Sequence, residues 1–411
     1  MSDSNSQMSL FDAVLASYPT DGHPLQNAEL YERVSARSSL TREKLNERVP
    51  IGAAGALHSP VKRKIRYIQQ DLRNRGLITH DEAAGRGKWK LTPKGAKHLT
   101  PATPGKVLVV FRTNLGLALW GSCDDVFPTL GEQIALGLMS PPYALRQPRA
   151  YGNVPEPEYV DWLCRKLEAV VRHLLPGGNI VLNVSNDIFL PDSPARSLYQ
   201  ERLVLALHSR FGLHKMDMIP WVNPCKLPGP KPWASDSRQQ LNVTWESLYW
   251  FTNDPVNCIS DNRRVLEPHT PSHAALLARG GEKRTTNYGD GAYRLREGSF
   301  GKPTAGRIPR NLITQGHHCP QTKLLRAAAK RLGLPHHGAT MPLAPLRKLI
   351  EFMTAPNDLV VDLFAGWFKT AKAAQQAGRR WICTELMGEY ALGAAAGFAD
   401  EEGFEPYGSV T

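Results

Sequence analysis

Residues 358–385 read DLVVDLFAGWFKTAKAAQQAGRRWICTE, and this stretch decides the fold. Its apolar pattern predicts a strand over 358–363, a helix over 369–377 and a second strand over 380–384. Similar alternation runs through the chain before it. It predicts further strands over 107–111, 115–120, 134–139, 179–184, 215–222 and 246–252, and further helices over 158–175, 198–211 and 343–353. We therefore expect an α/β domain whose mostly parallel sheet carries helices on both faces.

The turn after the strand at 358–363 has the features of a nucleoside site. The strand ends at Asp362, and Gly366 in the turn lets the backbone approach a ligand closely. Glu385 follows the next strand, 23 residues beyond Asp362, where an acidic side chain suits hydrogen bonding to a ribose diol. Because the longer glycine-rich phosphate fingerprint is missing, we expect a nucleoside without phosphates. The spacing alone also fits an ordinary strand–helix–strand turn.

A second short motif, Ser140-Pro141-Pro142-Tyr143, follows the apolar strand IALGLM at 134–139. Ligands of open α/β sheets bind at such strand ends. The Ser140 hydroxyl and the Pro141 carbonyl can accept both N–H bonds of an exocyclic base amine, which draws its nitrogen towards a nucleophilic, tetrahedral form. Tyr143 offers a flat face for a base taken out of its stack. A strand-terminating turn with a packing tyrosine is the alternative.

The charge of the chain points to an acidic partner. The 411 residues are 42% hydrophobic, which suffices for a large core, and 50 Lys and Arg against 38 Asp and Glu give a net charge of +12. Residues 60–98 carry a net +8 and residues 278–310 a net +5, so the rest of the chain is close to neutral. Two basic blocks favour two contacts on one polyanion, although each block alone fits a solvated surface.

No apolar run reaches the length of a membrane span, and the first residues lack the features of a signal peptide. The six cysteines do not form a disulfide framework. We therefore expect a cytoplasmic protein with reduced thiols and no membrane partner.

Residues 10–100 resemble the winged-helix domains found at the N-termini of some restriction-type proteins. The pattern predicts a helix over 61–75 and strands over 77–79 and 88–91, joined by a glycine-containing turn. As a DNA-binding domain it would use the helix for recognition and the turn for phosphates. The candidate contacts are Lys62, Arg63, Arg66, Arg86 and Lys88. The alternative is a small dimerisation or packing domain. The proline- and glycine-containing segment 100–106 predicts a linker near residue 104.

Together, the two motifs resemble those of DNA amino-methyltransferases that use S-adenosylmethionine, in the permuted order in which the catalytic tetrapeptide precedes the cofactor loop. The resemblance covers about residues 106–400. It includes GSCDDVFPTL at 121–130, the segment from MIPWVNPCKLPGPKPW to WESLYWFT, and HHGATMPLAPLRKLI before the cofactor loop. It implies a Rossmann-like methyltransferase sheet and direct attack of the amine on the methyl group, with no covalent intermediate and no metal.

Residue roles follow from the resemblance. The residues implied in catalysis are Ser140, Pro141, Pro142 and Tyr143, and those implied in cofactor binding are Asp362, Phe364, Gly366, Thr370, Glu385 and His337. Family members with Ser at the first tetrapeptide position are mostly cytosine-N4 enzymes, and those with Asp are mostly adenine-N6 enzymes. The expected activity is therefore methylation of the N4 amine of a flipped cytosine in double-stranded DNA, within a restriction-modification system that can include a nuclease for the same site. The alternatives are an adenine-N6 enzyme and a non-catalytic DNA-binding protein on the same fold.

The resemblance divides the chain into a DNA-binding domain (1–100), a catalytic half (106–252), a target-recognition region (253–335) and a cofactor-binding half (336–411). The candidate DNA contacts in the target-recognition region are Arg279, Lys283, Arg284, Arg294 and Arg296. The oligomeric state does not follow from the sequence.

The chain departs from the family pattern at two places. The family often reads Gly-Ser-Gly-Thr-Thr where this chain has GWFKT at 366–370, and Trp367 and Phe368 bring bulk to the expected cofactor site. Ser122 stands where an acidic residue is usual, so that Asp124 or Asp125 would have to replace it or the contact would be missing.

Overall fold

The computed structural model describes most of the chain. The described residues are 13–15, 17–19, 22–37, 40–51, 56–74, 76–82, 85, 87–93, 95, 99–145, 151–152, 154–289, 291, 293–338 and 340–407. No helix within these ranges has both the length and the apolar character needed to cross a membrane.

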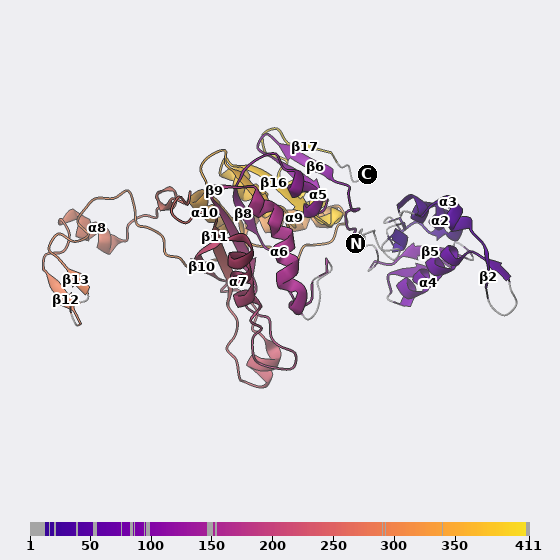
Figure 1. Ribbon diagram of the computed structural model, residues 1–411, viewed down its shortest axis with the longest axis horizontal. Helices are drawn as coiled ribbons and strands as arrows, with labels where there is room; N and C mark the ends of the chain where they lie inside the picture. The colour runs from indigo at the N-terminus through magenta and orange to yellow at the C-terminus, as the bar shows by residue number, and fades with distance from the viewer. Residues whose placement is uncertain are drawn as a thin grey trace.

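A ten-stranded sheet forms the centre of the molecule (Figure 1), in the order β14-β10-β11-β9-β8-β15-β16-β7-β6-β17. The strands are β6 (Leu108–Thr113), β7 (Gly116–Trp120), β8 (Ile134–Met139), β9 (Leu174–Val184), β10 (His214–Val222), β11 (Trp245–Thr252), β14 (Ile313–Thr314), β15 (Leu359–Asp362), β16 (Arg380–Glu385) and β17 (Glu405–Pro406). Neighbours within the group β9, β8, β15, β16 and β7 pair in parallel. β6 and β11 pair with this group antiparallel. The predicted α/β fold is confirmed, with a parallel centre and mixed edges.

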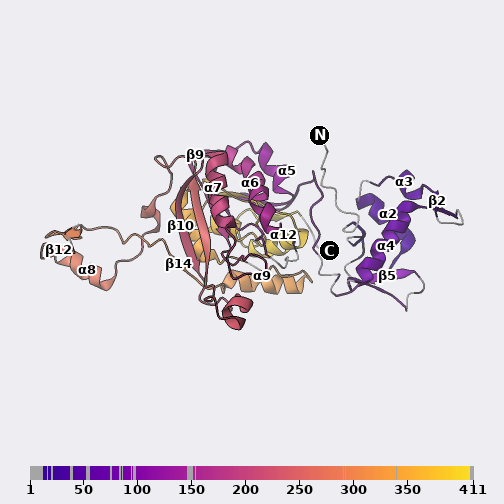
Figure 2. The same cartoon turned by 60° about the horizontal axis from the view of Figure 1, so that its bottom comes forward.

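Helices cover both faces of the sheet (Figure 2). One face carries α6 (Glu156–Arg172) and α7 (Tyr199–Phe211), and the other carries α10 (Leu343–Met353) and α11 (Lys369–Gln376). Side chains of β15 alternate between the two cores, because Val360 packs towards α10 and α11 while Leu359 and Val361 pack towards α6. A strand buried on both faces explains the unbroken apolar run of its sequence.

The predicted boundaries agree closely with these elements, with one difference after α6. The helix expected over 158–175 ends at Arg172, and residues from Leu174 onward already belong to β9. Gly177 therefore lies within this strand. A Cβ at Gly177 would come within 2.0 Å of the carbonyl oxygen of Asn257, so this glycine allows close packing at the start of β9.

The N-terminal unit has its own core and stands apart from the sheet (Figures 1 and 2). It contains α2 (Asn27–Arg37), α3 (Arg42–Asn46), α4 (Pro60–Asn74), a small sheet of β1 (Leu25–Gln26), β5 (Lys88–Leu91) and β4 (Ile78–His80), and the hairpin of β2 (Val49–Ile51) and β3 (Ala56–His58). The helix and the two strands expected here are confirmed, and residue 75 lies outside the described residues.

The predicted linker is not a free connection. Leu99 packs against Trp367 and Met387, and the amide of Ala102 donates a hydrogen bond of 2.7 Å to the carbonyl of Leu386. The chain is thus attached to the sheet domain several residues before position 104. The composition of 100–106 does not reveal this attachment, because it depends on the packing of Leu99 against distant residues. Among the described residues, contacts with the sheet domain are thus already present at Leu99, and the linker near residue 104 stays a prediction.

Two segments project from the sheet domain (Figure 1). One lies between β10 and β11 and includes a short helical turn, Lys231–Asp236. The other contains α8 (Pro271–Ala278) and the hairpin of β12 (Thr286–Tyr288) and β13 (Tyr293–Leu295). The predicted target-recognition region of 253–335 is only partly separate, because β14 pairs with β10 and α9 (Pro320–Arg331) packs against α12 (Gly388–Ala394).

Candidate active site

The two motifs singled out in the sequence meet at one edge of the sheet. Parallel strands that lie side by side end at the same edge, so β8 brings Ser140 beside the ends of β15 and β16. A cavity of about 380 Å³ opens there. Its lining includes all ten residues assigned to catalysis or cofactor binding: Ser140, Pro141, Pro142, Tyr143, His337, Asp362, Phe364, Gly366, Thr370 and Glu385.

The tetrapeptide is fixed by two residues that sequence reasoning missed. The Tyr143 hydroxyl lies 2.6 Å from Oδ1 of Asn183 and 2.9 Å from Oε2 of Glu246. The Ser140 hydroxyl, which is exposed to the cavity, lies 3.2 Å from the same Asn183 oxygen. Burial and the neighbouring Glu246 carboxylate raise the pKa of Tyr143, so the phenol keeps its proton and donates it to one of these oxygens.

Asn183 comes from β9, the strand next to β8, and Glu246 comes from β11, which pairs with the other side of β9. A polar residue within the apolar run IVLNV and a carboxylate at the start of WESLYWF are the signals that could have found them. Because β11 runs antiparallel to β9, its first residues lie at the same edge as the ends of the parallel strands.

Asp362 begins the expected cofactor loop, residues 362–370, and organises it. Its carboxylate accepts hydrogen bonds from the amide of Phe364 at 2.9 Å and from the Thr370 hydroxyl at 2.7 Å. Burial raises the pKa of Asp362 to about 6, against which these two donors act. The loop is thereby closed between its first residue and the first turn of α11.

Glu385 joins the loop to the segment after β16. One carboxylate oxygen accepts from the amide of Gly366 at 2.7 Å, and the other accepts from the amide of Met387 at 2.8 Å. Burial raises the pKa of Glu385 to about 7. Each oxygen has a second lone pair, so the carboxylate retains acceptor capacity for a ligand in the cavity.

Gly366 is required by its surroundings. Its φ of +54° is disfavoured for side-chain-bearing residues, and a Cβ would lie 2.9 Å from Nε2 of His337. The His337 ring stacks on Tyr151 with a centroid distance of 5.6 Å and meets Tyr390 edge-on at 4.6 Å. The predicted residues His337 and Gly366 are therefore in direct contact.

The bulky residues at 367 and 368 leave the cavity open. Phe368 adopts a φ of +51°, which turns its side chain into the core against Phe111, and it is fully buried there. Trp367 forms part of the cavity wall and packs beside Leu99 and Tyr390. A further aromatic contact, between Phe364 and Trp162 at 5.6 Å, completes the wall on the α6 side.

Neither acidic candidate near residue 122 replaces the usual acidic residue. The Asp124 carboxylate pairs with Lys166, and the Asp125 carboxylate accepts from the amide of Gly105 at 3.0 Å. Among the described residues, Ser122 lines the cavity and the two aspartates do not. Its hydroxyl accepts a hydrogen bond from the amide of Asp124 and caps the short helix α5 (Cys123–Val126).

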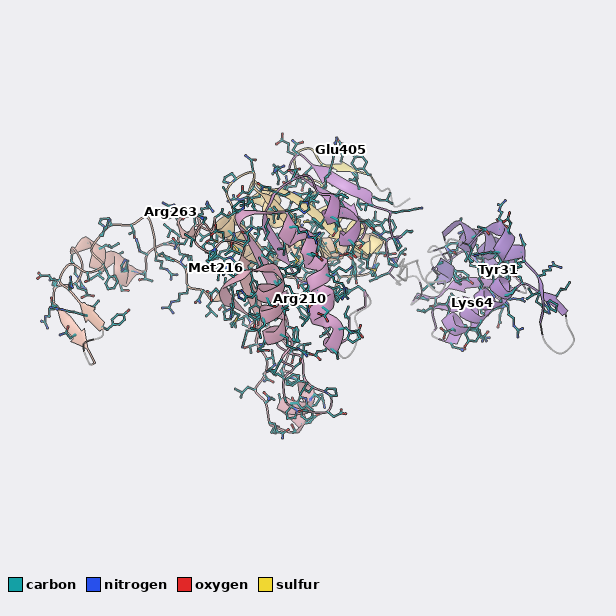
Figure 3. All side chains as sticks on the ribbon, in the orientation of Figure 1. Tyr31, Lys64, Arg210, Met216, Arg263 and Glu405 are labelled. Carbon is teal, nitrogen blue, oxygen red and sulfur yellow. The ribbon has the colours of Figure 1, made fainter. Side chains whose placement is uncertain are left out.

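The basic candidates for DNA contact lie away from the cavity. On α4, Arg63 and Arg66 are exposed, whereas Lys62 donates to Asn46 and lies over the ring of Tyr31. Figure 3 marks Tyr31 together with Lys64, a further exposed lysine of this helix. Lys88 is partly buried on β5, and Arg86 lies outside the described residues. The five candidates of the second projecting segment, Arg279, Lys283, Arg284, Arg294 and Arg296, are all exposed.

A salt-bridged base holds this projecting segment on the sheet domain. Glu267 and Arg307 pair across the two chain passages, and Lys348 of α10 donates to the same Glu267 at 2.8 Å. Figure 3 marks Arg263 near this base.

Comparison with known proteins places the chain in a family. The family model for N6/N4-type DNA methylases matches residues 134–396, and the model of the Mrr N-terminal domain matches residues 8–100. The type II methyltransferase M.PvuII of Proteus hauseri is 30% identical over 269 residues, which are 66% of this chain and 79% of that protein. M.BglII of Bacillus subtilis is 24% identical over 264 residues, which are 63% of this chain and 62% of that protein.

Among solved structures, the PvuII DNA methyltransferase, described as cytosine-N4-specific, is similar with a TM-score of 0.55 and 27% identity, over 70% of this chain and 88% of that one. The family resemblance expected from the sequence is confirmed, and so are the character of a DNA-modifying methyltransferase and an additional N-terminal domain. This chain belongs to the N6/N4-type DNA methylase family.

Proposed function

We propose that this protein transfers a methyl group from S-adenosylmethionine to the exocyclic N4 amine of a flipped cytosine in double-stranded DNA. The observation that carries the proposal is the single cavity that joins the Ser140–Tyr143 tetrapeptide to the Asp362–Glu385 loop. A base and a nucleoside cofactor bound in one cavity can meet without any movement of the sheet. The cytosine-N4 assignment is supported by Ser140 and by the similar PvuII enzyme.

The cofactor residues fit an adenosine with a short charged tail. When bound, S-adenosylmethionine, the methyl donor of the family, supplies a methyl group on a positive sulfonium. The free lone pairs of Glu385 would accept hydrogen bonds from the ribose hydroxyls, and Gly366 lets the backbone approach the cofactor closely. Phe364 and Trp162 offer apolar surface to the adenine.

The target amine would be activated by acceptors directly after β8. The Ser140 hydroxyl can donate its proton to Asn183, which leaves its lone pairs for an N–H of the base, and the Pro141 carbonyl can accept from the other N–H. The nitrogen lone pair would form the new N–C bond as the C–S bond of the sulfonium breaks, S-adenosylhomocysteine would be the leaving group, and the proton that the amine loses would pass to water. Tyr143, held by Glu246 and Asn183, is fixed in place to support the flipped base.

DNA would be held by basic surfaces beyond the cavity. We assign phosphate contacts to Arg63 and Arg66 of α4, and a target-recognition role to the segment that carries α8 and the β12–β13 hairpin. We further propose that methylation protects the recognition site against a restriction nuclease that shares it.

The deciding experiment is mass spectrometry of nucleosides from DNA that has been incubated with the protein and S-adenosylmethionine. We expect N4-methylcytosine. N6-methyladenine would instead assign the adenine-N6 activity. If neither modified nucleoside appears with DNA from several sources, the enzymatic proposal is contradicted and a non-catalytic DNA-binding protein is favoured.

The Ser140→Ala variant tests the assigned chemistry. We expect its methylation rate to fall at least about a hundredfold, because the reacting amine loses the acceptor that Ser140 supplies. DNA binding should stay nearly unchanged. Ser209→Ala, at an exposed serine of α7, is the matched control and should keep full activity. Equal loss of DNA binding and methylation in Ser140→Ala would remove Ser140 from the catalytic site.

A further inference from the structure

The segment between β10 and β11 leaves the sheet at the edge where Ser140 lies. β10 ends at Val222 and β11 begins at Trp245, and these two residues pair with each other. Because β11 runs antiparallel to β9 and β9 runs parallel to β8, both residues lie at the edge where β8 ends. Residues 223–244, the rim segment, therefore project from the edge at which the cavity opens (Figure 1).

The first turn of the rim segment is held by hydrogen bonds and prolines. The amide of Asn223 donates to the carbonyl of Thr244 at 2.7 Å, which joins the two passages of the segment. The amide of Lys226 donates to the carbonyl of Asn223 at 3.1 Å. Pro224 and Pro228 restrict the backbone before and after this residue. The protein itself thus sets the position of the turn.

The turn is also connected to Tyr143, to which we assign support of the flipped base. Nζ of Lys226 lies 3.5 Å from Oε1 of Glu246. The other oxygen of this carboxylate lies 2.9 Å from the Tyr143 hydroxyl. These contacts fix the place of the next residue, Leu227, relative to Tyr143.

Leu227 is a large apolar side chain that the protein leaves in water. Its exposed fraction is 84%. Single exposed leucines are common on protein surfaces, so exposure alone indicates no function. Leu227, however, lies at the cavity edge, in a turn that is held in place. Leucine is among the apolar side chains that proteins insert as wedges between the base steps of DNA.

The charge of the rim segment suits a DNA partner. The segment contains the basic residues Lys226, Lys231 and Arg238 and one acidic residue, Asp236. Asp236 pairs with Lys231. Arg238 is exposed and can contact a phosphate, so the segment offers both an apolar group for the bases and a cation for the backbone.

We propose that Leu227 enters the DNA duplex at the target and occupies the place that the flipped base leaves. The inference rests on the proposed function, because it presupposes that a base leaves the stack. Flipping costs the pairing and stacking free energy of that base. A leucine in the gap regains apolar contact with the neighbouring bases and hinders the return of the flipped base. Leu227 is thus a positioning residue, which acts on the flipping equilibrium and not on methyl transfer itself.

The test compares two duplexes that contain the methylation site, after the modified bases in product DNA have been mapped. The first duplex is fully paired. The second has an abasic site opposite the target, so that no base pair has to be broken. Single-turnover methyl transfer from S-adenosylmethionine gives a rate for each duplex. Each variant is compared with the wild-type protein on the same duplex, so that a lost contact with the missing base affects both proteins alike.

We expect Leu227→Ala to lower the rate on the paired duplex roughly ten- to a hundredfold, the range that burial of a leucine side chain represents. On the duplex with the abasic site, its rate should stay within about threefold of the wild-type rate, because the target no longer has to be unpaired. Leu227→Met should stay within about threefold on both duplexes, since methionine also fills an apolar gap. Leu227→Asn, of similar size but polar, should behave like Leu227→Ala.

Two further exposed apolar residues provide matched controls. Leu241 lies on the returning passage of the rim segment, with an exposed fraction of 88%. Val256 lies beyond the opposite end of β11, with an exposed fraction of 89%. Leu241→Ala and Val256→Ala should keep the wild-type rate on both duplexes. Unchanged affinity for S-adenosylhomocysteine, measured by calorimetry, shows that each variant is folded.

Three outcomes overturn the proposal: wild-type rates of Leu227→Ala on both duplexes, an equal loss on both duplexes, or the selective loss in Leu241→Ala instead of Leu227→Ala. An equal loss would make Leu227 a general DNA contact. The third outcome would assign the wedge to Leu241. If the wild-type protein methylates no DNA, the proposed function fails and this inference fails with it, and that result is distinct from the other three.

Discussion

At the scale of single residues, Glu385 carries the clearest pH dependence. Its buried carboxyl has a pKa raised to about 7, so about half of the cofactor-free molecules hold a proton there at neutral pH. Hydrogen bonds from ribose hydroxyls favour the ionised form and lower this pKa. Cofactor binding near pH 7 should therefore release up to about half a proton, and affinity should rise as the pH increases through 7.

Calorimetric titration with S-adenosylhomocysteine, in buffers of different ionisation enthalpy, measures this proton release. Glu385→Gln should abolish the release and weaken binding, whereas Glu405→Gln should change neither, because Glu405 pairs with Arg112 at the far edge of the sheet (Figure 3). An unchanged release in Glu385→Gln would assign the titrating group to another residue.

Gly366 allows a comparison of strain with contact. Gly366 and Gly378 both have positive φ, +54° and +69°, but a Cβ meets His337 only at Gly366, since nothing lies within 4 Å of Gly378. Alanine at either position should cost about 1–2 kcal/mol of folding free energy. Gly366→Ala should in addition weaken S-adenosylhomocysteine binding at least about tenfold, which corresponds to ~1.4 kcal/mol, because the new methyl group displaces His337 in the cavity wall. Equal affinities in the two variants would remove the His337 contact from the cofactor site.

Nine of the ten expected site residues belong to motifs at strand ends, and neighbouring parallel strands end together. His337 was expected from the family resemblance, in the segment before α10. Asn183 and Glu246 stand out locally as polar residues in apolar strands, but their place beside Ser140 depends on the pairing of β9 and β11, which no local pattern encodes. The direction of Phe368 was also hidden, because its left-handed backbone conformation is set by packing against Phe111.

At the scale of elements, α4 separates basic residues that are free to bind DNA from one that is not. Arg63 and Arg66 are exposed, whereas Lys62 is engaged by Asn46 and Tyr31. Each phosphate contact contributes about 0.9 to the slope of log K against log salt concentration. The double variant Arg63→Gln, Arg66→Gln should lower that slope by about 2, and Lys62→Gln should leave it nearly unchanged. Fluorescence anisotropy across a salt series measures both, and an equal effect of Lys62→Gln would show that this lysine leaves its partners to bind DNA.

The elements themselves were predictable where a strand or helix is long and periodic, as in β8, β15 and α10. Short elements escaped, because two residues of β14 or the small and aromatic residues of α12 carry no periodic signal. The linker near residue 104 stays a prediction. Its prolines mark an irregular chain, and the contacts that attach this chain to the sheet domain, at Leu99 and Ala102, carry no periodic signal either.

At the scale of the whole molecule, the N-terminal unit and the segment with α8 project from opposite ends of the sheet domain (Figures 1 and 2). Since the N-terminal unit has its own core, removal of residues 1–98 should leave the cavity intact. We expect this truncated protein to bind S-adenosylhomocysteine with unchanged affinity, but to bind DNA more weakly and with a smaller salt slope. Unchanged DNA affinity would contradict the DNA-binding role of the N-terminal unit.

The chain that leaves the N-terminal unit passes along the segment that follows Glu385 before it enters the sheet. Pro101 bridges to Met387, Thr100 exchanges hydrogen bonds with Gly388 and Glu389, and Met387 in turn donates its amide to Glu385. The connection to the N-terminal unit is therefore attached to the segment directly after Glu385, the carboxylate that we assign to the ribose. If DNA binding at the N-terminal unit changes the affinity for the cofactor through this connection, cofactor binding changes the affinity for DNA by the same factor.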